Sequence, residues 1–161
     1  MSYRIDDALL RTLNLKRVEH NSGEYQIVIP ERCNIARNTV ERSTHETPEN
    51  TALIFEREDL GTRTWSFVEL EQDASRLAHG LETLGIKRGD RVALHTGMRP
   101  ETGIAHMALH KLGVVAVTLS QLYGPDTLAH ILNHAEAKAI ITQTDAWARF
   151  RDRTDEFETL E

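Results

Sequence analysis

Apolar residues recur every three or four positions over residues 67–84, which predicts an amphipathic helix. Ser66 and Glu69 stand at its start with the spacing of a capping box, in which each side chain bonds the other residue's backbone N–H. Gly85 follows the last apolar position and is suited to end the helix, because glycine adopts left-handed backbone without strain. The pattern therefore predicts a helix with both ends marked in the sequence.

The chain before this helix divides into a lead-in and two further predicted elements. Residues 1–33 carry a short helical pattern, a polar break and an apolar run, and we expect them to lie outside the main domain. Asn34 is placed to cap a helix that stops before Pro48, since the residue before a proline disfavours helical backbone. Strand-like runs over 51–56 and 63–66 flank a short polar connection, which predicts a hairpin.

Strand and helix patterns alternate in short steps after the long helix. The expected strands are 91–95, 114–119 and 138–142, and the expected helices start at Pro100, at Gly124 and at Asp145, the last containing Trp147 and Phe150. Strands separated by helices of this length form right-handed crossovers and parallel sheets. We therefore predict an α/β fold, with a mainly parallel sheet, helices on both faces and the small hairpin, in one domain over residues 34–161.

Composition narrows the class of protein. Of the 161 residues, 40% are hydrophobic and 27% charged, as in folded globular domains, and the net charge of -6 offers no basic field for nucleic acid. Cys33 is the only cysteine, so an intrachain disulfide is impossible and a reducing, cytoplasmic compartment is expected. Asp6 and Asp7 precede any apolar run, so no signal peptide is expected. No stretch approaches the length of uninterrupted apolar residues that a membrane span requires.

The common nucleotide-binding motifs are missing from the sequence. A dinucleotide fold needs GxGxxG where a strand turns into a helix, but residues 96–100 contain a single glycine at that place. A phosphate loop of the GxxxxGK[ST] type is also missing, because residues 80–87 have isoleucine before the lysine and lie at a helix end. These patterns alone therefore predict no phosphate-binding loop.

Two histidine pairs are candidate metal ligands, and Cys33 is a candidate nucleophile. His106 and His110 are four residues apart on one predicted helix, and His130 and His134 repeat that spacing on the next. Neither pair has the HExxH pattern or an obvious third ligand, so we expect solvated histidines and no metal. Cys33 lacks a recognisable partner, and we assign no catalytic residue.

Several strings resemble the AMP-forming acyl-CoA synthetases, within the adenylate-forming superfamily. They occur in that family's order: residues 64–70, 85–94, 99–101, 105–108, 111–117 and 124–128. Residues 34–36 are similar to the start of the acetyl-CoA and medium-chain acyl-CoA synthetase branch. The resemblance covers residues 34–151, and it implies an incomplete N-terminal subdomain of an adenylate-forming enzyme.

The resemblance implies a two-step ligase reaction. A carboxylate attacks the α-phosphate of ATP to give an acyl-adenylate and pyrophosphate, and the thiol of coenzyme A then displaces AMP. The full-length family uses ATP, Mg²⁺ and coenzyme A, but its Gly/Ser/Thr-rich phosphate loop and its lysine-bearing segment lie beyond the matched strings. We expect none of the three to bind tightly to this chain alone, which should be inactive.

The resemblance also implies that one edge of the sheet contacts coenzyme A. The sequence differs from the family's usual pattern at two places in this region. Thr118 stands where the family usually has proline, and Gln121 and Leu122 replace a glycine-containing loop near the nucleotide end of coenzyme A. The candidate coenzyme A residues are Ser120, Gln121, Leu122 and Tyr123, with Arg149 and Arg151 as phosphate contacts. A surface loop and a solvated helix face are the alternative interpretation of these residues.

The sequence is compatible with three functions. The first is an N-terminal portion of an acyl-CoA ligase, whose partner is the remainder of the synthetase chain. The second is a standalone, non-catalytic interaction or oligomerisation module that self-associates through an exposed sheet edge. The third is a doubly wound regulatory domain that binds a nucleotide at the carboxyl ends of its strands. The acyl substrate is not encoded in these residues.

Overall fold

The computed structural model describes residues 16–19, 25–28, 32–59 and 61–160. Within the lead-in, strand β1 (Lys16–Glu19) pairs antiparallel with strand β2 (Tyr25–Val28). The short helical pattern predicted before Lys16 lies outside the described residues. Of the apolar run predicted to end at Pro30, Ile27 and Val28 belong to β2.

The helix predicted after Asn34 spans residues 35–46 and ends before Pro48. Its middle is a π-helical turn, η1 (Arg37–Glu41), and its last part is α2 (Arg42–Glu46). The Asn34 side-chain oxygen accepts a hydrogen bond from the backbone N–H of Arg37 at 3.2 Å, so the predicted cap is confirmed. The Asn34 amide nitrogen also donates to the carbonyl of His110 at 2.7 Å, which ties this helix to the end of helix α4 (Pro100–Leu112).

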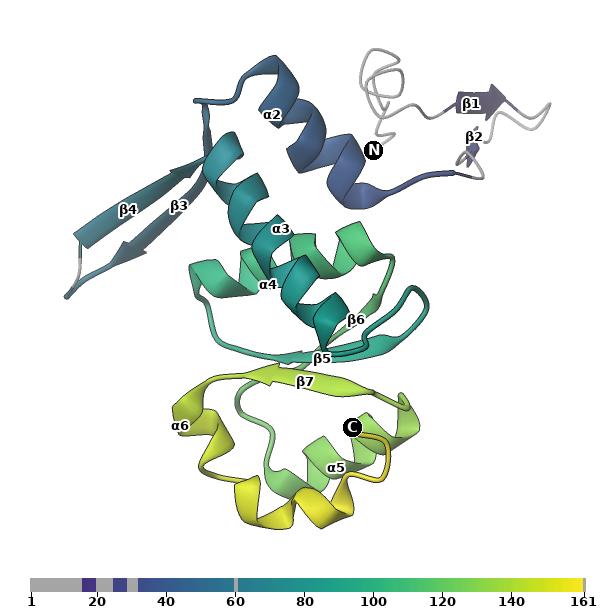
Figure 1. The fold of residues 1–161 in the computed structure, drawn as a ribbon, viewed down its shortest axis with the longest axis vertical. Coiled ribbons are helices and arrows are strands. Elements are labelled where there is room, and N and C mark those ends of the chain that lie inside the picture. The colour runs from purple at the N-terminus through teal and green to yellow at the C-terminus, as the bar shows by residue number, and fades with distance from the viewer. Residues whose placement is uncertain (1–15, 20–24, 29–31, 60, 161) are drawn as a thin grey trace.

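The hairpin and the long helix follow as predicted. Strands β3 (Thr51–Arg57) and β4 (Gly61–Ser66) pair antiparallel, and helix α3 (Phe67–Thr83) begins directly after them. Both halves of the capping box are present, because Ser66 accepts from the Glu69 N–H while the Glu69 carboxylate accepts from the Ser66 N–H. In Figure 1 the hairpin projects from the body of the molecule beside the start of α3.

Three parallel strands form the sheet, in the order β6-β5-β7. The strands are β5 (Arg91–His95), β6 (Val115–Thr118) and β7 (Ala139–Thr142), and the crossover helices are α4 (Pro100–Leu112) and α5 (Pro125–His134). Proline stands at the first position of both helices, where the missing N–H costs nothing. The structure confirms each of these elements, with the two edge strands slightly shorter than predicted.

Helices cover both faces of this sheet, as predicted. The central strand is completely buried over residues 92–95, and its side chains alternate between two cores. Val92 and Leu94 pack with Leu109 of α4, whereas Ala93 packs with Leu128 of α5 and with Phe150. In Figure 1, α3 and α4 accordingly lie on one side of the strands and α5 and the C-terminal segment on the other.

The C-terminal segment differs from its prediction. Helix α6 (Thr144–Trp147) is a single turn whose N-cap is Gln143, so Asp145 lies within the helix rather than capping it. Phe150 falls outside α6 and precedes a 3₁₀ helix, η2 (Arg151–Glu156). Phe150 is 1% exposed and packs edge-on against the rings of His95 and Phe157. The helix does not continue through residue 150 because the Phe150 ring is buried in the core. This tertiary effect is not visible in the periodicity of apolar residues in the sequence.

Candidate functional site at the carboxyl edge of the sheet

The three parallel strands end at one edge, and the loops that leave them form the candidate site. In open α/β sheets, ligands bind outside the carboxyl ends of the strands, because crossovers to opposite faces leave a crevice there. Here the loop after β5 contains Gly97, the loop after β6 contains residues 119–124, and the segment after β7 begins at Gln143. All the predicted coenzyme A residues follow the ends of β6 and β7.

Hydrogen bonds join these loops across the edge. The backbone N–H of Gly97 donates to the side-chain oxygen of Gln143 at 3.1 Å, which links the loops after β5 and β7. The side-chain amide of Gln121 rests on Gly97, where an added Cβ would stand only 2.6 Å from the Gln121 Oε1. The absence of a side chain at residue 97 therefore lets the β6 loop fold over the β5 loop.

The four predicted loop residues form a tight turn. The Leu122 N–H donates to the Ser120 hydroxyl oxygen at 3.2 Å, and the Tyr123 N–H donates to the Ser120 carbonyl at 3.1 Å. The Leu122 side chain is 92% exposed and that of Tyr123 is partly exposed. The turn thus presents an aliphatic and an aromatic side chain to solvent while Gln121 faces inward over Gly97.

Arg149 lies at this turn, and Arg151 does not contact it. The Arg149 guanidinium donates through Nη2 to the Gln121 carbonyl at 3.0 Å, across 28 positions of sequence. Arg151 is exposed and pairs with the adjacent Asp152 at 3.6 Å between Nε and Oδ1. The structure therefore brings Ser120, Gln121 and Arg149 together and leaves Arg151 on the outer side of η2.

Arg153 holds the C-terminal segment and was not anticipated from the sequence. Its guanidinium bonds Glu156 within η2 and Asp126 at the start of α5, each within 2.6 Å. These hydrogen bonds raise the pKa of Arg153, Glu156 having the larger effect and Asp126 the smaller. The cation therefore anchors η2 against α5, next to the turn that Arg149 contacts. Of these two ion pairs, only the one with Glu156 can be expected from the sequence, because Glu156 is three residues from Arg153.

His95 is the buried polar residue of the edge. Its Nδ1 lies 3.2 Å from the Thr142 hydroxyl, which itself donates to the His95 carbonyl at 3.1 Å. The Thr142 hydroxyl thus bridges the ring and the backbone of His95, and the donor and acceptor roles at Nδ1 depend on the imidazole tautomer. Nε2 is buried, with no hydrogen-bond partner among the described residues.

The electrostatics of the edge keep His95 neutral. Burial lowers the pKa of His95, and the nearby positive charge of Arg149 lowers it further, against an opposing contribution from the backbone of Ser120. A neutral ring suits the interior position between the sheet and Phe150. In the sequence, His95 is recognisable only as a histidine that follows the apolar residues 92–94 at the end of a strand.

The described residues do not fit a divalent metal. The ring centroids of His106 and His110 are 6.0 Å apart in a tilted pair, and those of His130 and His134 are 6.0 Å apart in a stacked pair. The pairs also lie on α4 and α5, which cover opposite faces of the sheet. No group of three or more possible ligands comes together in the described part of the chain, and we derive no step through a bound metal.

Comparison with known proteins decides the family. Residues 40–160 match the AMP-binding enzyme family. The chain belongs to this family. The resemblance of the sequence motifs to AMP-forming synthetases is therefore confirmed, and it now covers the hairpin, α3, the parallel sheet and η2.

Acetyl-coenzyme A synthetases are among the relatives of this AMP-binding enzyme chain. That of Bradyrhizobium diazoefficiens is 34% identical over 68% of the chain, and that of Methanothrix thermoacetophila is 32% identical over 73%. The human mitochondrial acetyl-coenzyme A synthetase 2-like protein is 30% identical over 77%. The matched residues span only 17% to 18% of the length of these relatives.

A solved structure supports the fold as well as the family. The anthranilate CoA ligase AuaEII, crystallised with anthranoyl-AMP, superposes with a TM-score of 0.73 at 25% identity. The match covers 83% of this chain and 25% of that ligase. The α/β architecture with a small hairpin is thus that of part of an adenylate-forming ligase. Among the described residues, no helix has the length and apolar character to cross a membrane.

Proposed function

We propose that this chain is the N-terminal portion of an ATP-dependent acyl-CoA ligase. The whole enzyme would convert a carboxylate, ATP and coenzyme A into an acyl-CoA, AMP and pyrophosphate. The observation that carries the proposal is the family match over residues 40–160, together with similarity to acetyl-coenzyme A synthetases in their N-terminal region. In this proposal residues 1–33 are a lead-in and residues 34–161 are the α/β subdomain.

We assign the β6 loop and Arg149 to the nucleotide end of coenzyme A. Ser120 and the backbone of residues 121–123 offer hydrogen-bonding groups, and Arg149 stands beside them with guanidinium N–H groups for a phosphate. Gln121 fills the space over Gly97, so coenzyme A would have to displace its amide or bind outside it. Arg151 is a second phosphate contact only if the ligand extends along η2.

We further propose that the 161-residue chain has no ligase activity by itself, and that it resides in the cytoplasm. Attack on the α-phosphate of ATP requires groups that neutralise triphosphate charge in the transition state. The sequence has no Ser/Thr/Gly-rich loop followed by lysine, and its described carboxylates and histidines do not gather into a Mg²⁺ site. The single exposed Cys33 thiol is compatible with a reducing compartment.

The test is formation of the thioester product. The purified chain is incubated with ATP, Mg²⁺, coenzyme A and acetate, butyrate or benzoate, and acyl-CoA is measured by chromatography beside an acetyl-coenzyme A synthetase as positive control. We expect product only in the control. Acyl-CoA above the no-enzyme rate with this chain would show that it contains the complete catalytic machinery and would overturn the proposal of inactivity.

A second candidate is a non-catalytic interaction module. It is favoured by the sheet edges, because among the described strands β6 and β7 each pair on one side only, and Val115 of β6 is 52% exposed. Sedimentation velocity over a range of concentrations separates the two. Concentration-dependent dimers that Thr118→Pro abolishes would support the module, because the N–H groups of Val115 and Leu119 bond toward β5 and that of Thr118 faces the open edge. A monomer at every concentration would exclude it.

A further inference from the structure

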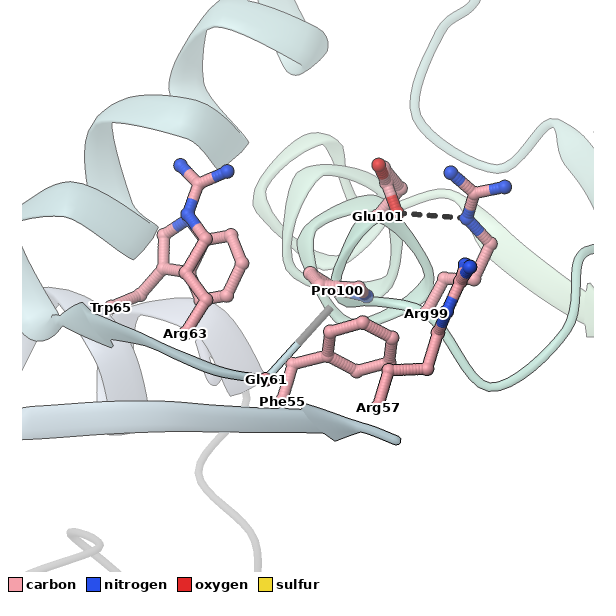
Figure 2. Close-up of a pocket in the computed structure, with 8 residues that line it drawn as sticks. All are labelled: Phe55, Arg57, Gly61, Arg63, Trp65, Arg99, Pro100 and Glu101. Atoms are coloured by element: carbon pink, nitrogen blue, oxygen red, sulfur yellow. Dashed lines mark hydrogen bonds and ion pairs between the residues drawn. The ribbon is translucent and has the colours of Figure 1, made fainter. Parts of the chain in front are cut away.

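A basic hollow lies between the hairpin and the start of α4, apart from the loops assigned to coenzyme A. It has a volume of about 240 Å³ and is lined by Phe55, Arg57, Gly61, Arg63, Trp65, Arg99, Pro100 and Glu101. Figure 2 shows Phe55 and Pro100 at its base, the Arg63 and Trp65 pair on one side, and Arg57 and Arg99 on the other. The strands β3 and β4 and the start of α4 therefore each contribute one arginine to a small space.

The base and one wall of the hollow are apolar. Trp65 is 5% exposed, and Pro100 at the first turn of α4 is also buried, so both are held by packing rather than by a ligand. The Arg63 guanidinium carbon lies 4.2 Å from the centroid of the Trp65 ring, which is cation-π geometry. A flat group entering the hollow would thus meet preformed apolar surface with a fixed cation at its margin.

The guanidinium groups keep hydrogen-bond donors available for an anion. Arg99 bonds Glu101 through Nε at 3.2 Å, and Arg57 bonds Asp59 through Nε and Nη2. Each guanidinium has five N–H donors, so these bonds leave Nη groups of both side chains without a described partner. Arg63 stacks on Trp65, and no carboxylate among the described residues forms an ion pair with it.

Glu101 makes the distribution of charge in the hollow asymmetric. The pKa of Glu101 lies below its ordinary value, chiefly because its own backbone N–H bonds the carboxylate, with Arg99 and the charge of Arg63 adding to this against the effect of burial. The carboxylate is therefore ionised at neutral pH and repels an anion from its own side. Asp59 pairs with Arg57 and Glu101 with Arg99, so the net positive charge of the hollow lies toward Arg63.

We propose that this hollow binds an aromatic anion, with its ring on Trp65, Phe55 and Pro100 and its carboxylate or phosphate on Arg57, Arg63 and Arg99. The shared chemistry is a planar ring joined to an anionic group that guanidinium can hold through two parallel hydrogen bonds. A second hollow shares four of the lining residues and continues past Arg76 and Leu77, which leaves room for a ligand longer than one ring. This inference is independent of the ligase activity proposed above.

The experiment uses the fluorescence of Trp65. The chain has two tryptophans, so Trp147→Phe leaves Trp65 as the only one, and this variant is titrated separately with benzoate, AMP and inorganic phosphate. We expect saturable quenching by benzoate or AMP, with half-saturation in the millimolar range or below, and weaker binding of phosphate because it has no ring. Benzoate and AMP distinguish a carboxylate from a phosphate as the anionic group.

Variants in the same background locate the site. Arg63→Gln and Arg99→Gln should each weaken binding about tenfold or more, while Arg63→Lys should keep part of it because charge is retained and the bidentate fork is lost. Arg37→Gln is the matched control, an exposed arginine of η1 that does not line the hollow, and should leave the titration unchanged. Circular dichroism checks that each variant is folded.

Three results would overturn the inference. They are the absence of saturable quenching by both benzoate and AMP, equal binding of phosphate and AMP, and unchanged binding in the folded Arg63→Gln and Arg99→Gln variants. A loss confined to Arg37→Gln would place the anion at η1 and would equally refute a site at the hairpin.

Discussion

Lys111 joins three helices through two ion pairs, and its removal offers a sharp test of the packing on this face of the sheet. Its ammonium group lies 2.6 Å from Glu41 of η1 and 2.5 Å from Glu71 of α3, and the three side chains are 17%, 32% and 23% exposed. Met keeps the length of the Lys111 stem and removes only the charge. Lys111→Met therefore leaves two half-buried carboxylates facing each other without a cation.

The magnitude follows from the exposure of the group. Breaking a fully buried pair costs about 3–5 kcal/mol, and an exposed pair contributes about 1 kcal/mol or less. With most of each side chain covered but none sealed from water, we expect a loss of about 2 kcal/mol in the free energy of unfolding at pH 7. For a chain of this size that corresponds to a melting temperature lower by roughly 4–8 °C. Urea unfolding followed by circular dichroism measures it.

The pH dependence identifies the loss as electrostatic. Burial acts to raise the pKa of Glu71, but hydrogen bonds from Lys111 and Ser75 outweigh it and hold the pKa below 4.5. For Lys111, burial acts to lower the pKa, but its bonds to Glu41 and Glu71 hold the pKa above 10.5. The stabilisation is therefore present between these two values, lost as pH falls through the lowered pKa of Glu71 or rises through the raised pKa of Lys111.

The control is the triple variant Lys111→Met, Glu41→Gln, Glu71→Gln, which removes all three charges and should recover much of the stability at pH 7. A Lys111→Met chain within about 0.5 kcal/mol of the parent at pH 7, below the usual size of a buried-charge effect, would refute the reasoning. An equal loss at pH 7 and at acid pH would also refute it, because packing rather than charge would then be responsible.

Three further changes have defined outcomes. Ser66→Ala removes the N-cap of α3 and should lower the free energy of unfolding in urea by about 1 kcal/mol. An unchanged urea midpoint would show that the cap does not stabilise the fold. Gly113→Ala should cost about 1–2 kcal/mol because φ is +70° and the new Cβ would stand 3.1 Å from Arg88 Cγ, whereas Gly103→Ala, inside α4 with open space, should be neutral or stabilising. His95→Phe should flatten the decline of stability below pH 6.5 by up to about 1.4 kcal/mol per pH unit, since the lowered pKa makes only the unfolded state take up that proton. Identical slopes would contradict the neutral, buried ring.

Local chemistry made much of the fold predictable. The capping box at Ser66 and Glu69, proline at the first turn of α4 and glycine after its end each act within a few residues. The alternation of apolar strands with amphipathic helices likewise determined the parallel sheet with two covered faces. The C-terminal helix was predicted wrongly because Phe150 packs in the core against Phe157 and against His95, which lies on β5, far away in the sequence.

The candidate site was predictable only in part. The family motifs pointed to residues 120–123 and to Arg149, and the structure places these together through the bond from Arg149 to the Gln121 carbonyl. Nothing in the sequence pairs Gly97 with Gln121, because that contact depends on the loops of two different strands meeting at one edge. The buried environment of His95 likewise depends on the ring of Phe150 and on the charge of Arg149.

We propose that this member of the AMP-binding enzyme family carries the sheet and its loops without the groups that activate a carboxylate. Exchange of labelled pyrophosphate into ATP reports the first half-reaction alone and does not require coenzyme A. With acetate, butyrate or benzoate present, the account predicts exchange by the isolated chain no faster than in buffer. Carboxylate-dependent exchange by the folded 161-residue chain would contradict it directly.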